Sequence, residues 1–225
     1  MKPGSLLIAL AVSLGAQGCA HLGAEDWAPA AERRLREATV WILEGDYAVC
    51  TGAVVVAPEL VVTSAHCLPG ERALGMDVPI ALSDGTRASA RIAAVSAEED
   101  LGILRLPRPA EVSPLQVGES DAAGGGVELL FLGMPLGDRE VQRSRVVTRG
   151  RCPSYPAVTD AVFADYRGSP GDSGAPLLAR DGVIGIVHGG QGCRIAIPSS
   201  RIAPLLRKAL GGQPRDGGGA LNLPR

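Results

Sequence analysis

Short apolar segments of strand length follow one another along most of this chain, separated by glycine, proline and other turn residues. Six precede the middle of the chain, at residues 39–43, 51–56, 60–63, 78–82, 89–95 and 101–106. Six follow it, at residues 127–132, 140–149, 161–164, 175–179, 183–187 and 195–197. A looser stretch at 107–126 divides the two sets. The pattern predicts an all-β fold of two antiparallel, barrel-like halves, closed by a helix at 200–210.

The amino terminus has the organisation of an export signal. Residues 1–18 hold a lysine near the start, an apolar run and small residues up to Cys19. The stretch Ala-Gln-Gly-Cys at 16–19 resembles the lipobox of bacterial lipoproteins, which implies lipidation of Cys19 and attachment to a membrane. The alternative is an ordinary secretory signal cut near Gly18 or Ala20. Both readings predict export from a bacterial cell, to the periplasm or the cell surface.

The remaining chain divides by composition. Residues 19–36 are rich in alanine, glutamate and arginine, so we expect a spacer there, either a short helix or a tether. Residues 37–211 hold the apolar segments and predict one folded domain, which we expect to be monomeric. Residues 212–225 are rich in glycine and proline with little to bury, and predict a disordered tail.

Charge and histidine content exclude several kinds of protein. The formal net charge of the 225-residue chain is −2, and no basic stripe with interleaved aromatic residues is present, so we expect no nucleic-acid partner. The apolar run near the start is too short for a permanent membrane span. The three histidines, His21, His66 and His188, are far apart in sequence, and no two cysteines have CxxC spacing. We therefore expect no metal site and no cofactor.

Five cysteines are an odd number for an exported protein, which tends to pair its thiols. Removing Cys19 as a lipidation site leaves Cys50, Cys67, Cys152 and Cys193, which allow three pairings.

Three segments carry the residue types that acyl transfer requires. A serine hydroxyl is a weak nucleophile and needs a base, a carboxylate that orients the base, and donors for the oxyanion. His66 lies at the end of an apolar strand, and Asp100 is the last acid before the strand at 101–106. Ser173 lies in the turn Ser-Pro-Gly-Asp-Ser-Gly-Ala-Pro at 169–176, where Gly171 allows close approach of the backbone.

These segments, in this order, resemble the trypsin/chymotrypsin superfamily of serine peptidases. Its TAAHC, D-[LI]-A-x-L and GDSGGP motifs correspond here to TSAHC at 63–67, DLGILRL at 100–106 and GDSGAP at 171–176. The resemblance implies two six-stranded antiparallel barrels with the site between them. It implies Ser173 as nucleophile, His66 as base, Asp100 as its orienter, and the N–H groups of Gly171 and Ser173 as oxyanion hole. Position in such a fold favours disulfides Cys50–Cys67 and Cys152–Cys193.

The resemblance predicts a serine endopeptidase that acts on a protein or peptide through an acyl-enzyme intermediate. No activation sequence precedes the domain, so Asp172 needs another partner or hydrogen bonds within its turn; in this the chain resembles bacterial members. Arg167 stands six residues before the nucleophile, which argues against trypsin-like specificity. One pocket wall is expected at 186–190, where His188, Gly189 and Gly190 leave an open slot. Arg167 or His188 facing that slot would favour an acidic residue; the alternative has Arg167 in solvent and His188 packed on the wall.

Three other readings compete. A GDS-type esterase would carry its serine near the amino terminus and alternate helices with parallel strands. The Gly-x-Ser-x-Gly elbow of α/β-hydrolases fails because residue 175 is alanine. The remaining alternative is a catalytically silent, chymotrypsin-fold binding protein of the cell envelope, which would normally lack one of the three catalytic residue types.

Overall fold

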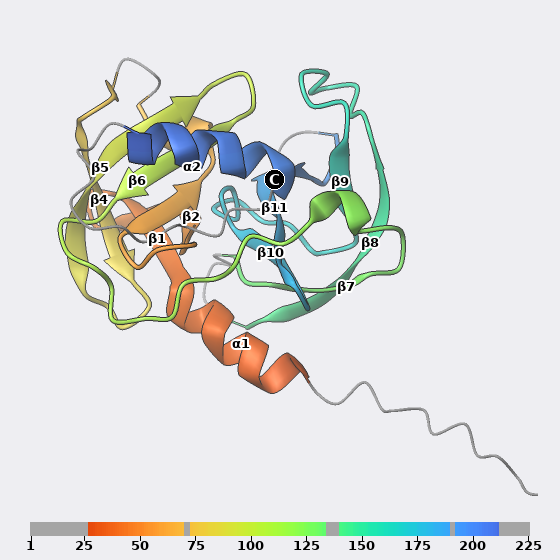
Figure 1. Ribbon diagram of the computed structural model, residues 1–225, viewed down its shortest axis with the longest axis horizontal. Helices are drawn as coiled ribbons and strands as arrows, with labels where there is room; N and C mark the ends of the chain where they lie inside the picture. The colour runs from red at the N-terminus through yellow and green to blue at the C-terminus, as the bar shows by residue number, and fades with distance from the viewer. Residues whose placement is uncertain (1–26, 70–72, 134–139, 190–191, 212–225) are drawn as a thin grey trace, which may run out of the picture.

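Two closed antiparallel barrels of six strands each form the body of the protein in a computed structural model, which describes residues 27–69, 73–133, 140–189 and 192–211 (Figure 1). The first barrel has the strand order β1-β2-β3-β6-β5-β4. Its strands are β1 (Thr39–Glu44), β2 (Tyr47–Val54), β3 (Leu60–Thr63), β4 (Asp77–Leu82), β5 (Arg87–Ser96) and β6 (Leu101–Arg105). The all-β prediction with two six-stranded barrels is confirmed.

The second barrel follows the looser stretch and has the order β10-β11-β12-β9-β8-β7. Its strands are β7 (Glu128–Phe131), β8 (Gln142–Gly150), β9 (Ala161–Ala164), β10 (Pro176–Ala179), β11 (Gly182–Gly189) and β12 (Ile195–Pro198). The chain thus completes the barrel with the His66 and Asp100 segments before it enters the barrel with the Ser173 segment.

Each apolar segment expected from the sequence overlaps one strand, and the largest difference is at the start of β2. Pairing of Glu44 with Tyr47 across a two-residue turn starts β2 four residues before the expected Thr51. Gly45, at φ +60°, supplies the left-handed conformation that such a turn uses. The apolar pattern missed these residues because Tyr47 is 78% exposed and contributes nothing to the core.

Helix α1 (Trp27–Ala38) occupies most of the predicted spacer. It lies against β7 of the second barrel, and its residues Leu35 and Ala38 are completely buried. The hydroxyl of Thr39 donates to the carbonyl of Leu35 at 2.6 Å, which joins the end of the helix to β1. Of the two readings of the spacer, this part is the helix, packed on the folded body.

Helix α2 (Ile202–Gly211) follows the second barrel, as expected, and packs on β5 and β6 of the first barrel (Figure 1). The expected cap Ser200 lies in a 3-10 turn, η4 (Ser199–Arg201), one turn before the helix. Arg105 of β6 donates to the carbonyl of Ala209 at 3.2 Å. Because only η4 separates α2 from β12, the helix joins the end of the second barrel to the outside of the first.

Several predictions fall on residues that lie outside the described part of the chain. They are the export signal at 1–18, lipidation of Cys19 and the disordered tail at 212–225. Within the described ranges, neither helix has the length and apolar content that a bilayer crossing requires.

Candidate active site

His66 lies where β3 ends and the chain turns toward the second barrel. It is the middle residue of a 3-10 turn, η1 (Ala65–Cys67). The preceding Ser64 is fully buried, and its hydroxyl donates to the carbonyl of Val187 in β11 at 3.0 Å. A disulfide joins Cys67 of the same turn to Cys50 of β2. The backbone on both sides of His66 is therefore anchored, while its side chain remains 44% exposed.

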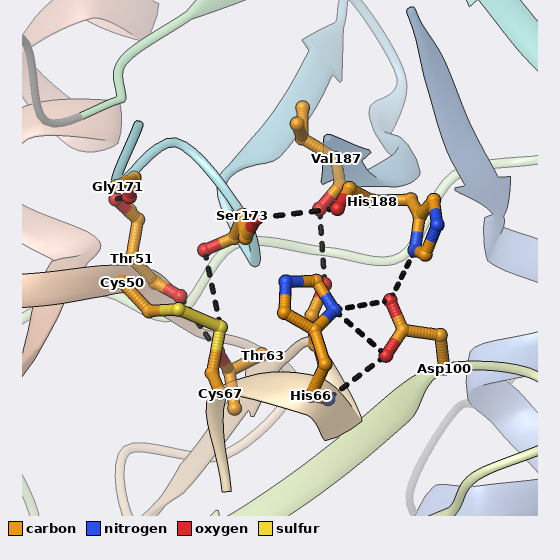
Figure 2. The surroundings of a disulfide bond; sticks show 11 residues. Cys50, Thr51, Thr63, His66, Cys67, Asp100, Gly171, Ser173, Val187 and His188 are labelled. Carbon is orange, nitrogen blue, oxygen red and sulfur yellow. Dashed lines mark hydrogen bonds and ion pairs between the residues drawn. A yellow bond between two sulfur atoms is a disulfide. The ribbon is translucent and has the colours of Figure 1, made fainter. Parts of the chain in front are cut away.

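Asp100 stands at the turn between β5 and β6, with only 3% of its surface exposed. Its φ of +50° is unusual for a residue other than glycine, and such conformations cluster at functional sites. The carboxylate accepts the backbone N–H of His66 at 2.9 Å, and it lies 2.9 and 3.0 Å from Nδ1 of the same residue. Two separate donors of His66 thus fix its ring against Asp100 (Figure 2).

A second imidazole reaches the same carboxylate. Nδ1 of His188, from β11, lies 2.5 Å from Oδ2 of Asp100. The ring of Tyr155 stacks on the His188 ring with 4.2 Å between centroids, and its hydroxyl donates to the carbonyl of Glu98 at 3.0 Å. Asp100 is therefore held between a ring from each barrel.

Burial of Asp100 raises its pKa, but the hydrogen bonds from His188 and His66 and the charge of His66 outweigh this effect. The net result lowers the pKa from the usual 3.8 to about 2. The group is therefore a carboxylate at neutral pH and accepts hydrogen bonds from both rings.

Ser173 lies on a tight loop that packs on the first barrel. Its carbonyl accepts the N–H of Thr51 in β2 at 2.8 Å. Gly174, at φ +87°, leaves no room for a side chain, since a Cβ there would collide with the carbonyl of Thr51 and the hydroxyl of Thr63. The Ser173 hydroxyl donates to the carbonyl of His188 at 3.2 Å. In Figure 2 the His66 ring lies between the Asp100 carboxylate and this loop.

The backbone N–H groups of Gly171 and Ser173 have no hydrogen-bond acceptor among the described residues. The φ of Gly171 is +96°, and its carbonyl accepts the hydroxyl of Thr51 at 2.8 Å. The carbonyls of Gly171 and Ser173 therefore bind Thr51 of the first barrel, while the N–H groups of the same two residues have no acceptor in the part of the chain that the structure describes.

Asp172, beside Ser173, is 2% exposed and accepts a hydrogen bond within its own turn. Its carboxylate accepts the N–H of Ser169 at 2.5 Å. It packs tightly against Gly133, where any side chain would collide with it. These contacts fix Asp172, and with it the Ser173 loop, in one position.

The residues expected to line a specificity pocket separate in the structure. Arg167 is exposed, and its backbone exchanges hydrogen bonds with the side chain of Gln142. The His188 ring is engaged with Asp100 and Tyr155. Gly189, at φ +71°, lies so close to Ser173 that a Cβ would be 2.9 Å from its Oγ, and Gly190 lies outside the described residues. The position of Arg167 accords with the solvent-facing alternative.

Tyr155 was not predicted as part of the site, and His188 was predicted only as part of a pocket wall. Tyr155 lies between β8 and β9 in a segment with no strand or motif signal, and only the fold brings it to His188. The hydrogen bond from His188 to Asp100 joins residues 88 positions apart. The second disulfide, Cys152–Cys193, links the loop that carries Tyr155 to the loop before β12.

Comparison with known proteins agrees with the fold and the motifs. The model of the family "Trypsin-like peptidase domain" matches residues 50–186, more than half of the chain. Human serine protease HTRA4 is 27% identical over 164 residues, which cover 69% of this chain and 34% of that protein. The serine protease Do-like HtrA of Bacillus subtilis is 26% identical over 168 residues, covering 67% and 36%.

Solved structures show the same architecture. The HtrA-type protease AlgW with a decapeptide aligns with a TM-score of 0.68 at 20% identity, covering 82% of this chain and 68% of that one. Deg5 aligns with a TM-score of 0.65 at 21% identity, covering 80% and 92%. The chain spans about a third of the length of the curated relatives. With two six-stranded barrels and a family match that spans all three motifs, this chain belongs to the trypsin-like peptidase domain family.

Proposed function

We propose that this protein is a serine endopeptidase that cleaves protein or peptide substrates through an acyl-enzyme intermediate on Ser173. The observation that carries the proposal is the His66–Asp100 pair, in which a buried carboxylate fixes the ring of an exposed histidine beside the Ser173 loop. Such a pair leaves Nε2 of His66 as the basic atom, because Nδ1–H is donated to Asp100.

In the proposed reaction, the Ser173 hydroxyl turns from the carbonyl of His188 toward Nε2 of His66. Catalytic hydrogen bonds commonly tighten only when substrate is bound. Oγ attacks the substrate carbonyl as Nε2 takes the hydroxyl proton, and the same proton then passes to the leaving amine. Asp100 stabilises the imidazolium without taking its proton, in keeping with a pKa of about 2. A water molecule then attacks the acyl-enzyme by the same steps, with Nε2 of His66 taking its proton.

The N–H groups of Gly171 and Ser173 are proposed to bind the oxyanion of the tetrahedral intermediate. Support comes from the loop, which gives neither group an acceptor among the described residues. Preorganised donors of this kind contribute roughly 3–4 kcal/mol each to the transition state of acyl transfer. A preference for an acidic residue before the cleaved bond stays a prediction that neither side chain supports, because the His188 ring is turned to Asp100 and Arg167 is exposed.

The proposal is tested with a fluorophosphonate probe, which labels activated serines. The purified protein is compared with Ser173→Ala and His66→Ala, and with Ser113→Ala as a matched control at an exposed serine outside the site. We expect the parent and Ser113→Ala to be labelled, and the other two variants to remain unlabelled. A folded parent with both disulfides that resists labelling would instead support the catalytically silent binding protein.

Labelling reports an activated serine, and peptide cleavage identifies the reaction. A library of peptides is incubated with the parent and with Ser173→Ala, and the products are read by mass spectrometry. Internal cuts made only by the parent are expected for an endopeptidase. Labelling without any cleavage would assign the activated serine to another acyl transfer.

A further inference from the structure

His188 adds to the site a second imidazole that the proposed reaction does not use as an acid or a base. Its Nδ1 and the Nδ1 of His66 lie 2.5 and 2.9 Å from the same oxygen, Oδ2 of Asp100. Ligand atoms of the three side chains all lie within 4.8 Å of one another, and the two rings meet edge to face with 5.5 Å between centroids. The two histidines are 122 positions apart in the chain and predicted no metal site, but the fold brings both rings to Asp100.

We propose that His66, Asp100 and His188 form a zinc site that holds the enzyme in an inactive state. Two imidazole nitrogens and one carboxylate oxygen are a ligand set that Zn²⁺ takes at about 2.0–2.2 Å, with a fourth position left for water. Tetrahedral ligands at such bond lengths lie about 3.3 Å apart, so the rings must withdraw from Asp100 by less than about 1 Å. The shift is about 0.4 Å for His66, whose side chain is 44% exposed, and about 0.8 Å for His188, whose side chain is 18% exposed.

The surroundings already orient these ligands. The backbone N–H of His66 holds Oδ1 of Asp100 and leaves Oδ2 toward the two rings. Tyr155 covers one face of the His188 ring, at an interplanar angle of 26°. Outer contacts of this kind fix the orientation of metal ligands and strengthen binding.

The local charge also favours a cation. Glu98, Glu99 and Asp100 are consecutive residues of the turn between β5 and β6. Arg201 pairs with Glu99 at 3.2 Å and offsets one of these charges. The carboxylates of Glu98 and Asp100 attract a divalent cation to the same place.

Zinc at this site would prevent the first step of the proposed reaction, so the inhibitory role rests on the proposed function. A neutral imidazole has one ring proton, and coordination through Nδ1 moves that proton through solvent to Nε2. His66 then presents an N–H to Ser173 where catalysis needs a lone pair. Asp100 is occupied by the metal at the same time and no longer orients the ring for catalysis.

Zinc binding is measured apart from activity, on full-length protein carrying Ser173→Ala and Cys19→Ser, by competition with a chromophoric chelator. We expect one equivalent to bind, and His188→Ala to weaken binding by more than about 100-fold, since loss of an outer contact alone costs 10–100-fold. His21→Ala is the matched control and should leave the affinity unchanged. Equal affinity with and without the His188 ring, or no stoichiometric binding, would overturn the site.

The inhibitory role is measured as the rate of fluorophosphonate labelling of the Cys19→Ser protein with its serine intact. Zinc is expected to slow labelling in step with occupancy of the site, and excess chelator to restore it. An unchanged rate at full occupancy would refute inhibition. A protein that binds zinc but is never labelled, even in chelator, would contradict the proposed peptidase function while leaving the metal site standing.

Discussion

Replacing Asp100 by asparagine should reveal how strongly the fold stabilises the buried carboxylate. Its pKa falls from 3.8 to about 2 on folding, so ionised Asp100 contributes about 2 kcal/mol of stability at neutral pH. Because the folded pKa is the lower one, this contribution is complete above about pH 5 and is lost as the pH falls through 2. At pH 2, where the native carboxyl is half protonated, roughly 0.4 kcal/mol of it remains.

The assay is urea unfolding of the parent and Asp100→Asn at several pH values between 5 and 2. Free imidazoles are already protonated at pH 5, so the range isolates the carboxyl. We expect the free energy of unfolding of the parent to exceed that of the variant at pH 5. This difference should shrink by about 2 kcal/mol between pH 5 and pH 2. Asp181→Asn, at an exposed carboxyl without a described hydrogen bond, is the matched control. If the difference in the free energy of unfolding stays constant down to pH 2, the histidine donors do not hold Asp100 ionised.

Two further substitutions test the positioning of the nucleophile and the histidine turn. Gly189→Ala puts a Cβ 2.9 Å from Oγ of Ser173 at φ +71°, whereas Gly192→Ala at φ +97° meets only Ser154, at 3.7 Å. Both variants should lose about 1–2 kcal/mol of stability, because a side chain strains the left-handed backbone. Only Gly189→Ala should slow fluorophosphonate labelling by 10-fold or more. Equal labelling rates in the two variants would contradict the contact between residue 189 and Ser173. Replacing Cys50 and Cys67 together by serine removes a disulfide that closes a loop of 17 residues. The free energy of unfolding, measured by urea titration, should fall by about 3 kcal/mol. A loss under 1 kcal/mol would contradict a stabilising role of this disulfide.

The pattern of short apolar segments was sufficient to predict both barrels because strand formation here follows local composition. Val, Ile and Leu recur in runs of strand length between Gly and Pro turns, and the runs that became β3 and β9 have the predicted bounds. The start of β2 was missed because its first residues are exposed and pair with β1 through a turn, not through burial.

The sequence by itself also predicted catalytic roles for His66, Asp100 and Ser173, since each stands in a short motif whose residue types acyl transfer requires. Only the tertiary structure decided how the other groups meet these three. His188 reads as part of a pocket wall in the sequence, but β11 brings its ring to Asp100, and the loop after β8 brings Tyr155 onto that ring. Such contacts join distant positions through the closure of two barrels, and no local pattern of residues encodes them.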